Sequence, residues 1–546
     1  MIEELPLDRF YRWERERPAR VFLTQPFGGG KLREWTWAQA AYEVRRIAGH
    51  LKAQGWEPGS RVAILSRNCA WWMMADLAIW MAGHVTVPVY PSLRAQTIRQ
   101  ILEHSDAKLC FVGPTDEPDA AIAGMPPGVP VIYFATDWDA LVAESAPIEG
   151  NPTRAGDELA TIFYTSGTTG VPKGVMHRFS ALTFCADILG ERLSLAGEER
   201  ILSYLPLAHI FERAGDAIPA VLGGWHVFFT EGPDTFIADL QRARPTVFLS
   251  VPRLLLKFQQ GVFEKIPRRT LDRLLRIPLV ARIVGNKVLR GLGLNKTRYA
   301  ACGSAPLSLD VLTWYRKLGL NLIEGYGLTE ALITHLTKPA KVRLGTVGST
   351  LEGVEDRRAA NGELQIKSPM NMMGYYKDAR ATEEAFTADG FLRTGDLADI
   401  EADGVVRIVG RIKEQFKTSK GKYVAPAPIE MKLAAHPDVE SCCLMGSGMA
   451  SPFAVVVLSA EARERPRPAV AEALARLLDS VNAQLEHHER LAFLVVAEEP
   501  WTIGNGLLTP TLKLKRGSLE QRYLARVEAW KRDGERVLWE AEQVAS

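Results

Sequence analysis

Short apolar runs typical of strands alternate with longer runs of helical spacing through the first part of the chain. The pattern predicts a strand at RVAIL, a helix through ADLAIWMAG, a strand at VTVPVY, a helix near QTIRQILEHS and a strand at KLCFVG. A similar rhythm recurs in WHVFFT, a helix through FIADLQRAR, and TVFLSV. Because such alternation favours parallel strands with helices on their faces, we expect an α/β fold with parallel-rich sheets.

The pattern changes from about Asp356. GELQIKS and GVVRIVG, with their glycine turns, predict β-hairpins, and the stretch 410–422 interrupts the apolar periodicity with glycines and charged residues. Beyond it, IEMKLAAH, VESCCLMG, FAVVVLS and a helix through AVAEALARLLDSVNAQLEHH predict a small α+β unit. Since 546 residues exceed one ordinary hydrophobic core, we expect separate domains over 1–410 and 411–546.

Composition narrows the function classes. The chain is 47% apolar and 24% charged, as in globular proteins, and its net charge of +2 gives no general reason to expect nucleic-acid binding. The basic segment 257–298 has a helical apolar pattern, which favours a solvated helical face over a nucleic-acid surface. We therefore expect small-molecule substrates and no nucleic-acid partner.

Cysteine usage and the N-terminus bear on location. The six cysteines are too scattered for a disulfide framework and contain no CxxC pair, which favours reduced thiols in the cytoplasm. The N-terminus is charged from its third residue, unlike a signal peptide. The apolar run Trp71–Val89 contains Asp76, Gly83 and His84, so it predicts a buried helix followed by a strand, not a membrane span.

The stretch YTSGTTGVPKGVMH, residues 164–177, predicts a phosphate-binding loop after the strand LATIFY. Its glycines let backbone N–H groups approach phosphate oxygens, and Lys173 adds a charge. It departs from the Walker A pattern because Pro172 replaces the second glycine and Gly174 follows the lysine. A flexible surface loop is the alternative. The hydroxyl donors are Thr165, Ser166, Thr168 and Thr169.

Two further segments follow predicted strands, where open α/β sheets bind ligands: GSAPL, 303–307, and NLIEGYGLTEA, 321–331. Tyr326 could stack on a base, Thr329 could donate to a phosphate, and Glu330 could bind magnesium through oxygen. The alternative is a tight turn in which Tyr326 packs into the core and Glu330 caps a helix.

Two charged residues are ambiguous on their own. Asp396, in FLRTGDLADI, is predicted at a turn, from which its carboxylate can accept hydrogen bonds from both ribose hydroxyls. Lys513, in NGLLTPTLKLKR, is an ordinary solvated charge unless the C-terminal unit folds over the phosphate loop.

Together these motifs resemble the adenylate-forming (ANL) superfamily of acyl-CoA synthetases, luciferases and peptide-synthetase adenylation domains. The resemblance covers nearly the whole chain in order, through RVAILSRNCAWW, YTSGTTGVPKGVM, LPLAHIFER, GSAPL, EGYGLTE, GYYKD, DGFLRTGD, GRIKEQFKTSKGKYV and TPTLKLKR. LPLAHIFER, EQFKTSKGKYVAP and NGLLTPTLKLKR are most similar to long-chain fatty-acyl-CoA synthetases.

The resemblance implies a two-step reaction with ATP, Mg²⁺ and CoA. A carboxylate and ATP give an acyl-adenylate and pyrophosphate, and the CoA thiol then displaces AMP. It also implies a large AMP- and acyl-binding domain followed by a small mobile C-terminal lid. A cytoplasmic enzyme with loose contact at the inner face of the membrane and a homodimer are expected by the same analogy.

The resemblance assigns roles residue by residue. Lys513, Thr329, Glu330 and His209 are catalytic, with His209 flanking the acyl site. Thr165 and Glu330 fix magnesium, Lys413 is the hinge, and Gly421 approaches CoA. The nucleotide site consists of Thr165, Ser166, Gly167, Thr168, Thr169, Gly170, Lys173, Gly303, Ser304, Ala305, Glu324, Gly325, Tyr326, Gly327, Thr329, Asp396, Arg411 and Lys513.

The last motif departs from the family pattern. It lacks the glycine that often precedes the lysine, and it offers Lys515 as a competitor. Lys513 is preferred because Arg516 follows it by three residues, as in the common pattern.

Several alternatives stay open from the sequence. The chain could be a ligase for medium-chain or aromatic acids, or an acyl-AMP ligase that loads a carrier-protein thiol. A non-catalytic nucleotide-binding scaffold is the alternative of another class. The joint presence of Lys173, Glu330, Asp396, Arg411 and Lys513 speaks against the scaffold.

Overall fold

The strands predicted in the first part of the chain form one sheet in the computed structural model, which describes residues 4–166, 172–195, 197–509, 513–532 and 534–543. Across the sheet the order is β18 (Gly374–Tyr375), β8 (Pro172–Arg178), β7 (Leu159–Ser166), β4 (Val85–Val89), β3 (Arg61–Leu65), β5 (Leu109–Val112) and β6 (Val131–Tyr133). Strands β3, β4 and β5 pair in parallel, as predicted, β6 and β7 join them in parallel, and β8 closes an antiparallel hairpin with β7.

Helices flank this sheet, and the most deeply buried of them is α3 (Ala70–Met81), which is apolar nearly all round. The run Trp71–Val89 is thus a buried helix followed by β4, as predicted. In the part of the chain that the structure describes, no helix is long and apolar enough to cross a membrane. The other helices of this region are α1 (Pro6–Glu16), α2 (Trp37–Ala53), α4 (Ala95–His104), α5 (Pro118–Ala123), α6 (Trp138–Glu144) and α7 (Phe179–Leu193).

A second sheet has the order β2 (Leu32–Thr36), β1 (Val21–Pro26), β10 (His226–Phe229) and β9 (Arg200–Ser203). The repeated rhythm at WHVFFT and TVFLSV is therefore not one βαβ unit, because β10 and β11 (Val247–Ser250) belong to different sheets. The connecting helices are α8 (Ile210–Glu212), the π-helix η1 (Arg213–Ala217), α9 (Ile218–Gly223) and α10 (Phe236–Ala243).

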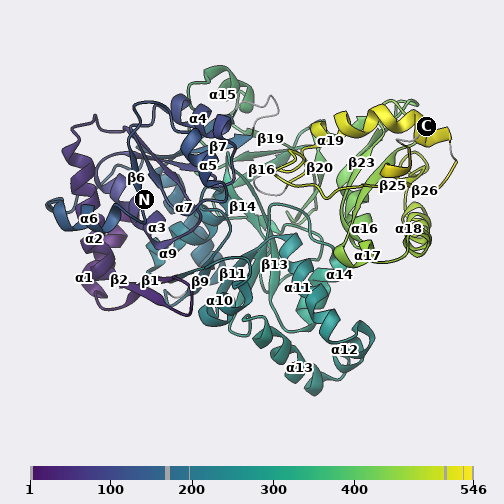
Figure 1. Ribbon diagram of the computed structural model, residues 1–546, viewed down its shortest axis with the longest axis horizontal. Coiled ribbons are helices and arrows are strands. Elements are labelled where there is room, and N and C mark those ends of the chain that lie inside the picture. Colours follow the sequence, from purple (N-terminus) through teal and green to yellow (C-terminus); the bar gives the residue numbers. More distant parts are fainter. Residues whose placement is uncertain (1–3, 167–171, 196, 510–512, 533, 544–546) are drawn as a thin grey trace.

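A third sheet carries the two ligand-binding segments predicted after strands. Its order is β11 (Val247–Ser250), β12 (Tyr299–Cys302), β13 (Leu322–Leu328), β14 (Leu332–Leu336) and β15 (Ser349–Thr350). Its connecting helices are α11 (Pro252–Lys265), α12 (Arg268–Leu274), α13 (Pro278–Gly291) and α14 (Leu309–Lys317). In Figure 1 the teal arm of α11, α12 and α13 extends away from the rest of the chain.

Beyond Asp356 the predicted hairpins form an antiparallel sheet with the order β16 (Glu355–Arg358), β17 (Glu363–Lys367), β19 (Leu392–Ile400) and β20 (Val406–Arg411). Helix α15 (Ala379–Ala385) precedes β19. Arg411, which the predicted boundary assigns to the C-terminal domain, is the last residue of β20 and is paired with Asp396.

The C-terminal residues form the expected small α+β unit, drawn in green and yellow in Figure 1. A short ribbon of β21 (Phe416–Lys417) and β22 (Tyr423–Val424) leads into it. Its sheet has the order β23 (Val439–Met445), β24 (Phe453–Leu458), β25 (Leu494–Val496) and β26 (Val537–Trp539). Its helices are α16 (Pro426–Ala434), α17 (Ala460–Arg463), α18 (Arg467–Asn482), α19 (Arg516–Tyr523) and α20 (Val527–Arg532). All six cysteines of the chain are buried and free, as predicted.

A buried ion pair joins α3 to the π-helix in the core of the large part. The Arg213 side chain is 0% exposed, and its Nη2 lies 2.7 Å from Oδ1 of Asp76. Thr86 donates a second hydrogen bond of 2.6 Å to the same carboxylate oxygen. The guanidinium also lies over the rings of Trp72 and Trp80. Each charge therefore depends on the other, since neither has water to solvate it.

We expect Asp76→Asn to lower the free energy of unfolding by about 3–5 kcal/mol, because it leaves the Arg213 charge buried and uncompensated. Asp403→Asn is the matched control: Asp403 pairs with Arg343 at 2.6 Å, but both side chains are about half exposed. Urea unfolding followed by tryptophan fluorescence measures both. Equal losses in the two variants contradict the expectation.

Candidate functional site

A cleft of about 2500 Å³ is lined by residues from every motif of the resemblance except RVAILSRNCAWW. It runs between the large N-terminal part and the C-terminal unit. The predicted residues that line it are Thr165, Lys173, His209, Gly303, Ser304, Ala305, Glu324, Gly325, Tyr326, Gly327, Thr329, Glu330, Asp396, Arg411, Lys413 and Lys513. Gly421 does not line it and lies in the turn between β21 and β22. Gly167, Thr168, Thr169 and Gly170 lie outside the described residues, as does the side chain of Ser166.

The predicted phosphate loop is carried on the β7–β8 hairpin. Thr165 and Lys173 are directly opposite each other in its register, so both belong to strands and the loop proper is shorter than predicted. Gly174 must be a glycine, because a Cβ there would lie 2.8 Å from Cγ2 of Ile162. The Lys173 ammonium lies 4.9 Å from the centre of the Tyr375 ring. The hairpin thus presents a hydroxyl and a cation side by side on the cleft wall.

The EGYGLTE motif is also more strand-like than predicted. Gly325 to Leu328 continue β13 and pair with β14, and the turn consists of Thr329 to Ala331. A Cβ on Gly327 would lie 2.0 Å from the carbonyl oxygen of Leu332, so the close strand pairing requires glycine there. The turn therefore projects Thr329 and Glu330 from the end of a rigid hairpin.

Two residues that the sequence did not assign a role hold this turn. His177 of β8 lies with its Nε2 2.6 Å from the carbonyl oxygen of Thr329. Because the carbonyl can only accept, Nε2 carries the proton, and burial lowers the pKa of His177 to about 4, which keeps the ring neutral near pH 7. Tyr375 donates its hydroxyl to Oε1 of Glu330 at 2.9 Å. Both lie in motifs quoted above, but only the contacts reveal their part.

Tyr326, Asp396 and Arg411 form a second linked group. The Tyr326 hydroxyl donates to Oδ2 of Asp396 at 2.6 Å, and Nε of Arg411 lies 2.9 Å from Oδ1. Burial, together with the Asp396 charge, raises the pKa of the Tyr326 hydroxyl, so it remains a donor. The Asp396 charge also raises the pKa of Arg411. Each carboxylate oxygen has a second lone pair, so both can still accept from a ligand.

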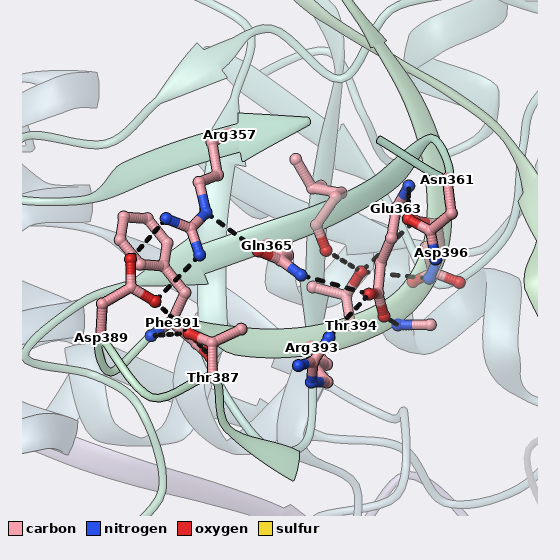
Figure 2. Close-up of polar contacts among 12 residues, drawn as sticks. Arg357, Asn361, Glu363, Gln365, Thr387, Asp389, Phe391, Arg393, Thr394 and Asp396 are labelled. Atoms are coloured by element: carbon pink, nitrogen blue, oxygen red, sulfur yellow. Dashed lines mark hydrogen bonds and ion pairs between the residues drawn. The ribbon is translucent and has the colours of Figure 1, made fainter. Parts of the chain in front are cut away.

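The prediction that Asp396 lies at a turn is wrong, because the residue lies within β19. The preceding Gly395 adopts a positive φ of 71°, which kinks the strand and which glycine accommodates without strain. Figure 2 shows how this kink is held: the buried carboxylate of Glu363 accepts from the Gly395 N–H at 3.0 Å, and Thr394 accepts from the Asp396 N–H at 3.1 Å. Glu363 is a further positioning residue that the sequence did not reveal.

The GSAPL segment follows β12, as predicted, and faces Glu324. Ser304 has a positive φ of 67°, a strained conformation for a residue with a side chain. Burial raises the pKa of Glu324 to about 7, although backbone N–H groups of Gly345 and Leu307 favour its charged form. One of its carboxyl oxygens, Oε2, has no hydrogen-bond partner among the described residues. An acceptor of this kind, aimed at the cleft, suits the amino group of a base.

His209 lies at the start of α8 and accepts the Phe211 N–H on its Nδ1 at 3.2 Å. Burial, followed by the positive charge of Lys513, lowers its pKa to about 3, so the ring is neutral. Apolar residues line the cleft beyond it, among them Leu189, Leu193, Phe211, Trp225 and Leu249. The cleft thus joins a charged wall to an apolar wall at His209.

Lys513 reaches this cleft from the C-terminal unit. The surrounding protein and the charge of Arg411 lower the pKa of its ammonium, while the carboxylates of Asp396 and Glu330 oppose that shift. Three residues later, Arg516 is fixed by Glu430, whose two oxygens lie 2.9 Å from its two terminal nitrogens. The C-terminal unit thus brings Lys513 to the cleft that Thr165 and Lys173 also line, although the lysine side chain stays exposed.

The comparisons with known proteins agree with this arrangement. The family model "AMP-binding enzyme" matches residues 10–376, and the model "AMP-binding enzyme C-terminal domain" matches residues 413–531. The long-chain-fatty-acid–CoA ligase FadD15 of Mycobacterium tuberculosis is 30% identical over 95% of this chain and 96% of its own. The chain belongs to the family of AMP-binding enzymes.

Solved structures share the fold at lower identity. The anthranilate CoA ligase AuaEII, in complex with anthranoyl-AMP, superposes with a TM-score of 0.80 at 20% identity, over 96% of this chain and 99% of that one. The adenylation domain of a carboxylate reductase from Mycobacterium chelonae gives a TM-score of 0.80 at 23% identity, over 97% and 92%. The fold is therefore the mixed α/β fold of adenylate-forming enzymes.

We expect Asp396→Asn to weaken AMP binding about 10- to 100-fold, because an amide offers one acceptor where the carboxylate offers two and leaves Arg411 uncompensated. Isothermal titration calorimetry measures the change. Asp399→Asn is the control, since Asp399 lies on the same strand with its side chain 62% exposed. An unchanged dissociation constant in Asp396→Asn contradicts a ribose-binding role.

Proposed function

We propose that the chain is an ATP-dependent acid–thiol ligase that forms acyl-CoA from a long-chain fatty acid through an acyl-adenylate. The observation that carries the proposal is the convergence of Lys173, Glu330, Asp396 and Lys513 on one cleft that also has an apolar wall. The similarity to FadD15 of Mycobacterium tuberculosis supports the choice of acid and acceptor.

The first step joins two anions, so the chain's contribution is positioning and charge stabilisation. A carboxylate oxygen attacks the α-phosphorus of ATP, an acyl–phosphate bond forms, and the bond to pyrophosphate breaks. We assign the pyrophosphate half to Thr165 and Lys173, and the α-phosphate to Thr329. Lys513 bridges the carboxylate and the α-phosphate, while Tyr326 lies against the adenine.

The residues present fit a magnesium ion bound together with the nucleotide. The described residues contain no group of three or more His, Cys, Asp or Glu side chains able to hold a metal on their own, so phosphate oxygens must complete any coordination shell. Glu330 supplies a carboxylate and Thr165 a hydroxyl, oxygen donors of the kind that Mg²⁺ prefers. When bound, the ion neutralises phosphate charge.

In the second step the CoA sulfur attacks the acyl carbon, the thiol proton leaves to solvent, and AMP departs. We propose that the thiol approaches the acyl carbon where Lys513 stands in the first step, so that the C-terminal unit must move. We propose that residues near Lys413 absorb this rotation, with residues 1–410 and 411–546 as the two bodies and Gly421 approaching CoA. We also propose that the protein is a cytoplasmic homodimer. Because long-chain acids partition into bilayers, we further propose peripheral contact at the inner membrane face.

We expect Lys513→Ala to reduce carboxylate-dependent ATP–pyrophosphate exchange at least about 1000-fold, because the cation that offsets charge in the transition state is lost. Conversion of preformed acyl-adenylate by CoA should persist, since that step proceeds without the lysine in place. Lys515→Ala is the matched control and should exchange normally. Normal exchange by Lys513→Ala would falsify the assignment of this lysine.

A series of acids of graded chain length tests which acid the enzyme prefers as its substrate. We expect thioester formation to favour palmitate-range acids, and Gly215→Leu to shift the preference toward shorter ones. The reason is crowding: a Cβ on Gly215, which lines the cleft, already comes within 2.3 Å of Cδ1 of Leu249. Gly190→Leu is the control, because a Cβ there meets open space. Preference for medium-chain or aromatic acids, or transfer only to a carrier protein, overturns the long-chain choice.

A further inference from the structure

Helix α13 exposes an apolar stripe that the rest of the chain leaves uncovered. Leu279 is 80% exposed and Ile283, one turn further along, is 71% exposed, while Ile277 just before the helix is 54% exposed. Leu279 is the most exposed of the large apolar residues in the part of the chain that the structure describes. Contiguous exposure of this kind marks an interaction surface, in contrast to single scattered side chains.

The orientation of α13 is fixed by its opposite face. A Cβ on Gly285 would lie 2.4 Å from the carbonyl oxygen of Leu318, so the helix packs there at backbone distance. Leu289 of α13 and Leu271 of α12 are buried in the core cluster beneath. The helix therefore cannot rotate to hide Leu279 and Ile283 without breaking this contact.

The surroundings of the stripe are strongly basic. Residues 257–298 contain eleven Lys and Arg residues against Glu264 and Asp272, a net charge of +9 in a chain whose total is +2. Arg268 and Asp272 are 3.8 Å apart. The exposed basic residues of this segment that form no ion pair with any described residue are Lys257, Lys265, Arg269, Arg273, Arg276, Arg282, Lys287, Arg290 and Lys296.

Apolar and basic residues share one face of α13. Arg282, Ile283, Lys287 and Arg290 lie three, four, eight and eleven positions after Leu279, which are spacings of one helical face, and all of them are exposed. A helix with bulky aliphatic residues flanked by cations on one face suits a lipid interface, where aliphatic groups enter the acyl region and cations meet phosphates. The arm also starts at the cleft, because Pro252 and Leu256 of α11 line it.

We propose that the α12–α13 arm binds an anionic lipid bilayer, with Ile277, Leu279 and Ile283 entering the interface and the unpaired basic residues facing lipid phosphates. The inference rests on the proposed peripheral membrane contact and identifies the surface that makes it. Charge complementarity favours a lipid surface over a second copy of the chain, whose identical arm would carry the same +9.

The test is co-sedimentation of the full chain with vesicles of phosphatidylcholine, with or without phosphatidylglycerol. Wild type should bind the anionic vesicles and release them at high salt. Leu279→Ser/Ile283→Ser should weaken binding at least about tenfold. Arg276→Gln/Arg282→Gln/Lys287→Gln/Arg290→Gln should weaken binding roughly fivefold per charge removed and should reduce its salt dependence.

Matched controls lie elsewhere on the surface. Ile122→Ser removes an aliphatic side chain that is 63% exposed on α5, and Arg380→Gln removes an exposed cation on α15. Both should bind vesicles like wild type. Thioester formation from a water-dissolved short acid should be the same in all variants, which reports intact folding and tests the proposed function separately.

Three results overturn the proposal. Wild type that forms acyl-CoA but ignores anionic vesicles rejects the lipid surface and leaves the proposed function standing. Arm variants that bind vesicles as tightly as the controls reject this location. If Leu279→Ser/Ile283→Ser converts a dimer to monomers in sedimentation velocity and leaves vesicle binding unchanged, this face of α13 binds a second copy of the chain instead.

Discussion

The hydrogen bond from Nε2 of His177 to the carbonyl oxygen of Thr329 is the contact on which the geometry of the cleft depends. It ties the strand that carries Lys173 to the turn that carries Thr329 and Glu330, which are over 150 residues later in the chain. Tyr375 closes the same unit, because its ring lies under the Lys173 ammonium and its hydroxyl holds Glu330. A buried hydrogen bond of this kind is costly to leave unmade, so the cation and the carboxylate keep a fixed separation.

The group to which we assign the ribose is organised differently, through charge. Arg411 and Tyr326 both bind the Asp396 carboxylate, and Glu363 holds the strand kink that aims it. Lys513 reaches this charged group from a separate part of the chain, in which Arg516, three residues later, is held by Glu430. The groups to which we assign phosphate and ribose are thus built into the large part, whereas Lys513 belongs to the C-terminal unit that we propose to move. On that proposal, the division lets one cleft serve two successive reactions.

The sequence predicted the parallel strands and the later hairpins, and all of its fully described candidate residues except Gly421 line the cleft, because residue type and strand context carry that information locally. It did not predict that Asp396 lies inside a strand or that EGYGL continues β13, since both depend on pairing with distant strands. The sequence did not reveal the role of His177, because a buried hydrogen bond to a carbonyl distant in the chain produces no local sequence pattern. The helical pattern at 257–298 was correct, but the face it exposes is set by the Gly285–Leu318 contact.

The proposed substrate is an amphiphile, and the cleft of the protein has a charged wall and an apolar wall to match its two ends. A carboxylate head needs the charged wall, an alkyl chain needs the apolar wall, and His209 lies where the two meet. Because burial and the Lys513 charge keep that imidazole neutral, it can cap α8 without competing with Lys513 for the carboxylate. The same combination of apolar and charged groups is found on the outer surface, where aliphatic and basic residues lie together on the arm that begins at the cleft. An acid drawn from a bilayer would thus meet apolar and cationic groups both where the enzyme meets the lipid and where the acid reacts.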